Sequence, residues 1–147
     1  MTPLDEEYQT RIVSDLNCLA RLAAMENARE TRSSAAMMAE LYRYRRRKEG
    51  ELVELSAELR AVELCLRLVK PRYGIDCSWD FLSSGVEAIL VPRGELLRGV
   101  EDRISRRIGR EEDFWIRIVT VREEKSCSIL VHEGPGEDEP VRMNCPL

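Results

Sequence analysis

The fold class depends most on one stretch, residues 52–70, which reads LVELSAELRAVELCLRLVK. Its apolar residues recur every three or four positions, as they do on one face of an α-helix. The set comprises Leu52, Leu55, Leu59, Val62, Leu66 and Val69. Because Pro71 disfavours a helical conformation of the residue before it, we expect the helix to stop near Lys70–Pro71. The stretch predicts an amphipathic helix whose apolar face packs on another layer.

Downstream of this helix the apolar period changes to that of strands. Cys77, Trp79 and Phe81 alternate with polar residues, which predicts a half-buried strand before a turn at 83–85. The elements expected next are a short strand at 86–91, a helix opened by Pro92, strands at 114–121 and 126–131, and a last strand at 141–145. This order predicts an α+β layer, with a mixed, mainly antiparallel sheet, attached to a helical hairpin.

Upstream, residues 1–50 predict a helical hairpin. Thr2 and Pro3 favour a helix start, and we expect the first helix to run to about residue 30, with the break at 31–34. The second helix should end in the basic run 43–48. The apolar residues expected in a dimer or partner interface are Ile12, Leu16, Leu19, Met38 and Leu41. Such a hairpin buries its stripes best against a second copy, so we expect a homodimer.

Composition limits the classes of function. The 147 residues carry 23 Lys and Arg against 27 Asp and Glu, a net charge of −4, which argues against a nucleic-acid or anionic-membrane binder. No apolar run approaches the roughly 20 residues that span a bilayer, and the first 30 residues contain no signal-peptide core. We therefore expect a cytoplasmic protein without membrane association. Five widely spaced cysteines and a single histidine predict reduced thiols and no metal site.

Three segments resemble LytS-type sensor histidine kinases. Residues 38–73 follow the pattern LS-x-LLRY … V-x-L-x-x-EL-x-x-V-x-x-YL-x-L-x-x-x-RF, with Glu58 and Leu59 at its EL pair. Residues 92–106, PRGELLRGVEDRISR, lie over the motif PPLLLQPLVENAIKH. Residues 131–136, VHEGPG, are similar to the adenine loop V-x-DNGPG. The resemblance covers residues 9–136 and implies a hairpin of dimerisation and phosphotransfer type over 1–50, followed by a GHKL-type α/β sandwich over 51–147.

Within this resemblance the residues that carry the chemistry have changed. Thr10 stands where the family has its phosphoacceptor histidine, and a threonine cannot form a phosphoramidate. Asp102 replaces the asparagine that holds Mg²⁺, while the preceding Glu101 is retained. His132 replaces the aspartate that reads adenine, and a neutral imidazole offers only one acceptor, at a longer reach. The resemblance therefore implies degenerate phosphoacceptor and nucleotide sites.

A deletion affects the site more than these substitutions do. Only residues 137–140 separate the glycine loop, which contains Gly134 and Gly136, from the last expected strand, which begins at 141. In the family this interval holds a flexible lid and a second glycine-rich turn that opens a helix facing the phosphates. Without that helix N-terminus the triphosphate charge lacks compensation. The resemblance thus implies a truncated GHKL domain with no catalytic residue, cofactor or metal.

These observations favour a non-catalytic histidine-kinase-like protein, a pseudokinase. It would dimerise and bind a two-component partner, a response regulator or a histidine kinase, to modulate phosphotransfer. One alternative is a GHKL domain with residual Mg-ATP binding, in which Asp102 holds the cation. Another alternative is an ATPase-inactive phosphotransfer protein, which is disfavoured because the hairpin contains no histidine.

Overall fold

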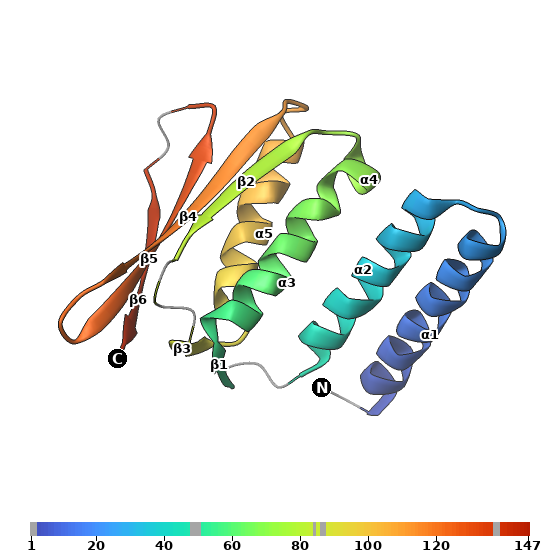
Figure 1. Ribbon diagram of the computed structural model, residues 1–147, viewed down its shortest axis with the longest axis horizontal. Coiled ribbons are helices and arrows are strands. Elements are labelled where there is room, and N and C mark those ends of the chain that lie inside the picture. Colours follow the sequence, from blue (N-terminus) through green and yellow to red (C-terminus); the bar gives the residue numbers. More distant parts are fainter. Residues whose placement is uncertain (1–2, 48–50, 84, 86–87, 137–138) are drawn as a thin grey trace. The chain divides into compact units, whose positions relative to one another are not determined.

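The computed structural model describes residues 3–47, 51–83, 85, 88–136 and 139–147, and the chain divides into two units, Met1–Lys48 and Glu49–Leu147. The first unit is an antiparallel pair of helices, α1 (Pro3–Met25) and α2 (Arg29–Arg46), as Figure 1 shows. The chain reverses at 26–28, earlier than the break predicted at 31–34. Asn27 adopts a left-handed backbone (φ 58°), which asparagine tolerates better than most residues. The turn is therefore made by Asn27, and residues 31–34 are helical.

The second unit combines two sheets with three helices. In chain order its elements are β1 (Leu52–Glu54), α3 (Leu55–Arg67), α4 (Val69–Tyr73), β2 (Cys77–Leu82), β3 (Leu90–Pro92), α5 (Glu95–Ile108), β4 (Phe114–Arg122), β5 (Ser126–Gly134) and β6 (Val141–Pro146). The larger sheet has the order β2-β4-β5-β6; β2 and β4 are parallel and the other pairs antiparallel. β1 and β3 form a separate antiparallel pair. The α+β class and the mixed, mainly antiparallel sheet are confirmed.

The core of this unit lies between the helices and one face of the larger sheet. Figure 1 shows α3 and α5 side by side against that face. Alternate residues of β4, beginning with Phe114 and Ile116, are buried, whereas Trp115 and Arg117 lie on the opposite, exposed face. The helix stripe predicted from 52–70 is buried from Leu55 onward. The apolar face of α3 therefore packs as its spacing predicted.

Several predicted boundaries are wrong because strand pairing overrides local pattern. Leu52 belongs to β1 instead of the helix, since residues 52–54 pair with 90–92. The strand predicted at 86–91 is observed at Leu90–Pro92, and residues 86–87 lie outside the described chain. Pro92 therefore ends β3 and does not open α5, which begins after Gly94 (φ 83°). The helix end predicted near Lys70–Pro71 is also wrong, because α3 already ends at Arg67. Pro71 lies in the first turn of α4, where a proline costs no helical hydrogen bond.

Candidate functional site

The N-terminus of α5 is held by a buried carboxylate from α3. The backbone N–H groups of Gly94 and Leu97 donate to Glu58 Oε2 and Oε1, both at 3.0 Å. Glu58 is fully buried, and its negative charge lies at the positive end of the helix dipole. These are the kind of N–H groups that a phosphate would use at a helix N-terminus. In this fold the carboxylate of Glu58 accepts the hydrogen bonds of both N–H groups.

The C-terminal half of α5 is joined to the end of β5 by a buried ion triad of Arg103, Arg107 and Glu133. Arg103 Nη1 donates to Glu133 Oε1 at 2.5 Å, and Arg107 Nε donates to Oε2 at 2.8 Å. All three side chains are at most 4% exposed. Arg107 Nη1 also donates to the carbonyl oxygen of Pro135 at 2.7 Å. Both carboxylate oxygens are therefore paired, and the loop after β5 is fixed to α5.

A groove of about 420 Å³, the α5–β6 groove, lies beside this ion triad. Its lining residues are Glu95, Leu96, Gly99, Asp102, Arg103 and Arg106 of α5, Val131 of β5, and Val141, Arg142, Met143 and Asn144 of β6. Asp102 and Glu95 offset the exposed Arg106 and Arg142, so the groove has no large excess of positive charge. Such a balance does not compensate a triphosphate.

The structure does not bring the other expected nucleotide-site residues into this groove. Glu133 faces α5, so His132, the neighbouring strand residue, points to the opposite face of the sheet. His132 there lies next to Arg117 in the β4–β5 register, and Arg117 pairs with Asp80 at 3.4 Å. Asp102 and His132 are therefore separated by the sheet. Their identities alone could not reveal this, because it depends on the strand register.

The glycines of the loop have structural surroundings of their own. Gly134 is the last residue of β5 and is opposite Trp115 in β4. A Cβ atom at Gly134 would lie 2.3 Å from Trp115 Cε2, so the indole packs directly on the glycine backbone. Gly136 is exposed in the turn after β5 and has φ 130°, and Glu101 is half-buried on α5. Close packing of Trp115 explains the requirement for glycine at 134 without a ligand.

The described residues contain no group of three or more His, Cys, Asp or Glu side chains that could hold a metal ion. All five cysteines are free thiols. Burial, with a smaller contribution from Cys65, raises the pKa of Cys77 to about 12, and burial also raises the pKa values of Cys127 and Cys145. Thiols with raised pKa values are poor nucleophiles at neutral pH. These three cysteines therefore have the environment of structural residues.

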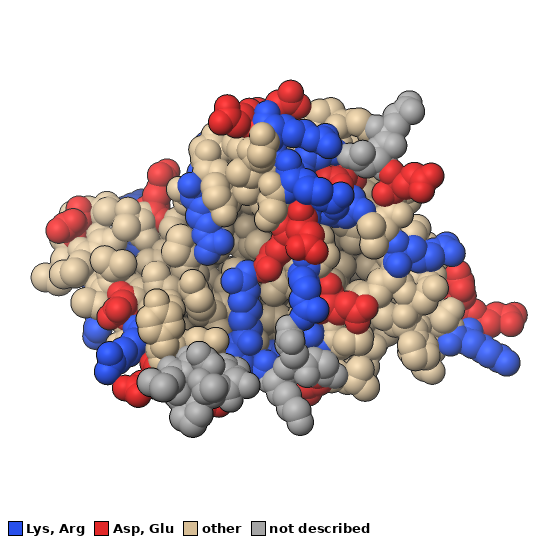
Figure 2. Space-filling view, turned by 180° about the vertical axis from the view of Figure 1, so that it is seen from behind, with Lys and Arg blue, Asp and Glu red and all other residues tan. Residues whose placement is uncertain are grey.

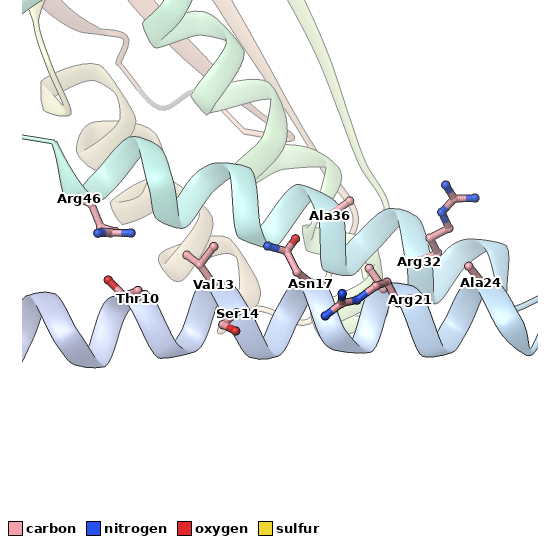
Figure 3. Close-up of a pocket in the computed structure, with 10 residues that line it drawn as sticks. Thr10, Val13, Ser14, Asn17, Arg21, Ala24, Arg32, Ala36 and Arg46 are labelled. Carbon is pink, nitrogen blue, oxygen red and sulfur yellow. The ribbon is translucent and has the colours of Figure 1, made fainter.

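Thr10 lies in a second groove, the hairpin groove, between α1 and α2. This groove has a volume of about 720 Å³, and its lining residues are Thr10, Val13, Ser14, Asn17, Ala20, Arg21 and Ala24 of α1 and Arg32, Ala36 and Arg46 of α2. Figure 3 shows the guanidinium of Arg46 pointing from α2 toward Thr10. The Thr10 hydroxyl donates to the carbonyl oxygen of Glu6 at 2.8 Å. The phosphoacceptor position therefore holds a hydroxyl that is satisfied within its own helix.

The expected interface residues of the hairpin differ in exposure. Leu19 is 53% exposed; Ile12, Leu16 and Met38 are half-buried, and Leu41 is buried. Apart from Met25 at the end of α1, the sequence pattern did not single out two exposed apolar residues of this helix, Tyr8 and Leu22. With Ile12 and Leu19 they form one line, the α1 stripe, because their spacings of four, seven and three keep them within about 80° on a helix with 3.6 residues per turn. The α1 stripe is therefore an apolar surface that lies partly open to solvent.

Charged side chains of both signs lie on the face seen in Figure 2. Figure 2 shows Lys and Arg interspersed with Asp and Glu across the visible face, without a continuous basic stripe. A nucleic-acid interface needs such a stripe. None of the helices in the described part of the chain is both long enough and apolar enough to cross a membrane.

Comparisons with known proteins do not identify the chain. Neither the protein-family models nor the curated proteins contain a match to it. A function must therefore be argued from the geometry of the ion triad and of the two grooves.

Proposed function

We propose that the chain is a non-catalytic, histidine-kinase-like signalling protein that dimerises through its helical hairpin and binds a response regulator or a histidine kinase to modulate phosphotransfer. One observation carries the proposal. The buried ion triad of Arg103, Arg107 and Glu133 occupies the contact between α5 and the end of β5, where the resembled kinases receive adenine. On this proposal, the second unit is a degenerate GHKL-type domain.

The sequence differences at this contact support loss of the ligand. Arg103 stands at the alanine of the motif VENAIKH, and Glu133 stands at the asparagine of DNGPG. The two substituted residues lie 30 positions apart and pair with each other, so two changes that would each bury a lone charge compensate one another. Opening this contact for a nucleotide would break a buried ion pair, at a cost of about 3–5 kcal/mol.

Glu58, which stands at the glutamate of the family's EL pair, supports a retained core in the second unit. Its carboxylate accepts the N–H groups of Gly94 and Leu97. A phosphate arriving there would meet a buried negative charge instead of free donors. A domain that keeps this core contact, and whose α5 N-terminus is occupied by a carboxylate, is better suited to binding proteins than to turnover.

Thermal unfolding with Mg-ATP or Mg-ADP tests the loss of nucleotide binding. A ligand present at about 100 times its dissociation constant adds about 2.7 kcal/mol and raises the midpoint by several degrees. We expect no shift at millimolar nucleotide. In a second assay the chain is added to a histidine kinase and response regulator of its own organism, and phosphate on the regulator is followed. A changed level is expected; an unchanged level with every pair tried contradicts the proposal.

A second candidate, residual Mg-ATP binding, is favoured by the α5–β6 groove. Asp102, Arg106 and Arg142 line it and are exposed, and a Mg²⁺ ion held by Asp102 would supply the positive charge that the groove itself lacks for a triphosphate. This candidate predicts a Mg²⁺-dependent rise in the unfolding midpoint. The rise would be lost in Asp102→Ala and in Arg142→Ala and retained in Arg110→Ala, a change at an exposed arginine outside the groove.

A further inference from the structure

The hairpin groove has positive charge and lacks negative charge. Its ten lining residues include Arg21, Arg32 and Arg46 and no aspartate or glutamate. None of these three guanidinium groups makes an ion pair or side-chain hydrogen bond with any residue in the described ranges. The positive charge of these arginines attracts an anionic partner. A guanidinium group binds a carboxylate through two parallel hydrogen bonds.

The groove is long, and several of its lining residues are small. It extends along α1 from Thr10 to Ala24, a length of about 21 Å at 1.5 Å per residue. Ala20 and Ala24 of α1 and Ala36 of α2 line it with small side chains; Figure 3 shows Ala36 between Arg46 and Arg32, and Ala24 beyond Arg32. Small side chains let another helix approach closely between two packed helices. The shape therefore fits a rod about four turns long better than it fits a compact anion.

The arginines are distributed toward both ends of this rod-shaped space. Arg46 points toward Thr10 near one end, and Arg21 lies on α1 nearer the other end, as Figure 3 shows. Thr10 and Arg21 are eleven residues apart on α1, about 16 Å along the axis. Arg32 lines the Arg21 end, although its guanidinium points away from α1 in this view. A single phosphate cannot contact both ends at this separation.

We infer that the hairpin groove binds an acidic helix of a partner protein, with carboxylates about three turns apart that pair with Arg46 at one end and with Arg21 at the other. Residues eleven positions apart on a helix lie within about 20° of one face, so one side of such a helix reaches both ends. This inference rests on the proposed function, since it specifies the chemistry by which the partner is recognised.

The position of the groove leaves the dimer surface free. Thr10 is two residues from Tyr8 of the α1 stripe, and two residues rotate by about 200° on a helix. The groove and the α1 stripe therefore lie on opposite sides of α1. A second copy on the α1 stripe and an acidic helix in the groove can bind at the same time, so the two interactions can be tested separately.

The probe is a fluorescent helical peptide of about 20 residues with glutamate pairs about three turns apart on one face. Its isomer has the same composition, but the glutamates are distributed around the helix. Binding to the full chain is measured by anisotropy at low and at physiological salt. We expect the first peptide to bind about tenfold more tightly than the isomer, and both to weaken as salt screens the charges. Equal binding of the two peptides overturns the inference.

Charge reversal locates the site. Arg21→Glu and Arg46→Glu should each weaken the first peptide about tenfold, whereas Arg110→Glu, which makes the same charge change at an exposed position outside the hairpin, should leave binding unchanged. Circular dichroism confirms that the variants are folded. Displacement of the peptide by equimolar tripolyphosphate would mean a small-anion site. A change of oligomeric state in Arg46→Glu would mean that a second copy fills the groove. Either result overturns the inference, while the nucleotide and phosphotransfer assays still judge the proposed function.

Discussion

At the scale of single residues, Glu58 shows how one side chain can hold two elements. It belongs to α3 and accepts hydrogen bonds from Gly94 and Leu97 at the start of α5. Glu58→Gln removes the charge and replaces one acceptor oxygen by a donor, so a buried N–H loses its partner. We expect unfolding to become easier by about 1–3 kcal/mol in urea titrations. Glu63→Gln, on the same helix but in exposed pairs with arginines, should cost less than about 1 kcal/mol.

The buried ion triad gives a prediction with an internal control. Glu133→Leu removes the carboxylate of the triad and leaves Arg103 buried without this ion-pair partner, and we expect a loss of about 3–5 kcal/mol in the free energy of unfolding. Replacing all three residues, Arg103→Met, Arg107→Met and Glu133→Leu, removes every buried charge of the triad. Most of the loss should then be recovered in chemical denaturation. A triple variant no more stable than Glu133→Leu would show that the triad itself stabilises the fold.

Cys77 gives the pH-dependent prediction. Its pKa is raised from 9.0 to about 12, chiefly by burial. In the unfolded chain this thiol ionises near pH 9 and in the folded chain only near pH 12, so its contribution to stability is complete below pH 9 and is lost as the pH rises toward 12. The unfolding midpoint of the wild type should therefore fall more steeply above pH 9 than that of Cys77→Ser. Parallel curves in thermal melts would contradict this assignment.

At the scale of elements, β4 and β5 depend on the contact of Trp115 with Gly134. A Cβ at position 134 would meet the indole at 2.3 Å. Gly134→Ala should therefore destabilise the fold by about 1–3 kcal/mol, and the loss should shrink in the double variant with Trp115→Ala. Gly99→Ala is the matched control, because a Cβ in the middle of α5 meets nothing within 4 Å. It should stabilise the protein by about 0.5–1 kcal/mol. Both effects are read from denaturation midpoints.

The element scale also shows why sequence patterns placed elements better than they placed their ends. The apolar spacing of α3 and the alternation of β2 report a buried face, and both were predicted. The start of α3 depends on Leu52 pairing with Pro92, forty residues away, and the start of α5 depends on Glu58. A local window contains neither partner. Boundaries therefore moved wherever a long-range hydrogen bond competed with local preference.

At the scale of the whole molecule, the α1 stripe of Tyr8, Ile12, Leu19 and Leu22 leads us to expect a homodimer. Leu19→Glu with Leu22→Glu places two charges in the centre of the stripe, so the mass from light scattering should fall from that of two chains to that of one. Ser33→Glu, at an exposed position of α2 outside the stripe, is the control and should remain dimeric. A double variant that stays dimeric would move the interface away from α1.

The sequence by itself determined the α+β class, the apolar faces and the order of the longer helices and strands, because residues buried on one face recur at a regular local spacing; it did not reveal β1 or the separate helix α4. It also identified Thr10, Asp102 and His132 as positions of interest. Only the tertiary structure decided which of them share a site. The strand register places His132 and Glu133 on opposite faces of the sheet, and pairing across 30 residues turns Arg103 and Glu133 into one buried contact. Charges far apart in the chain become partners only when the fold removes the water between them.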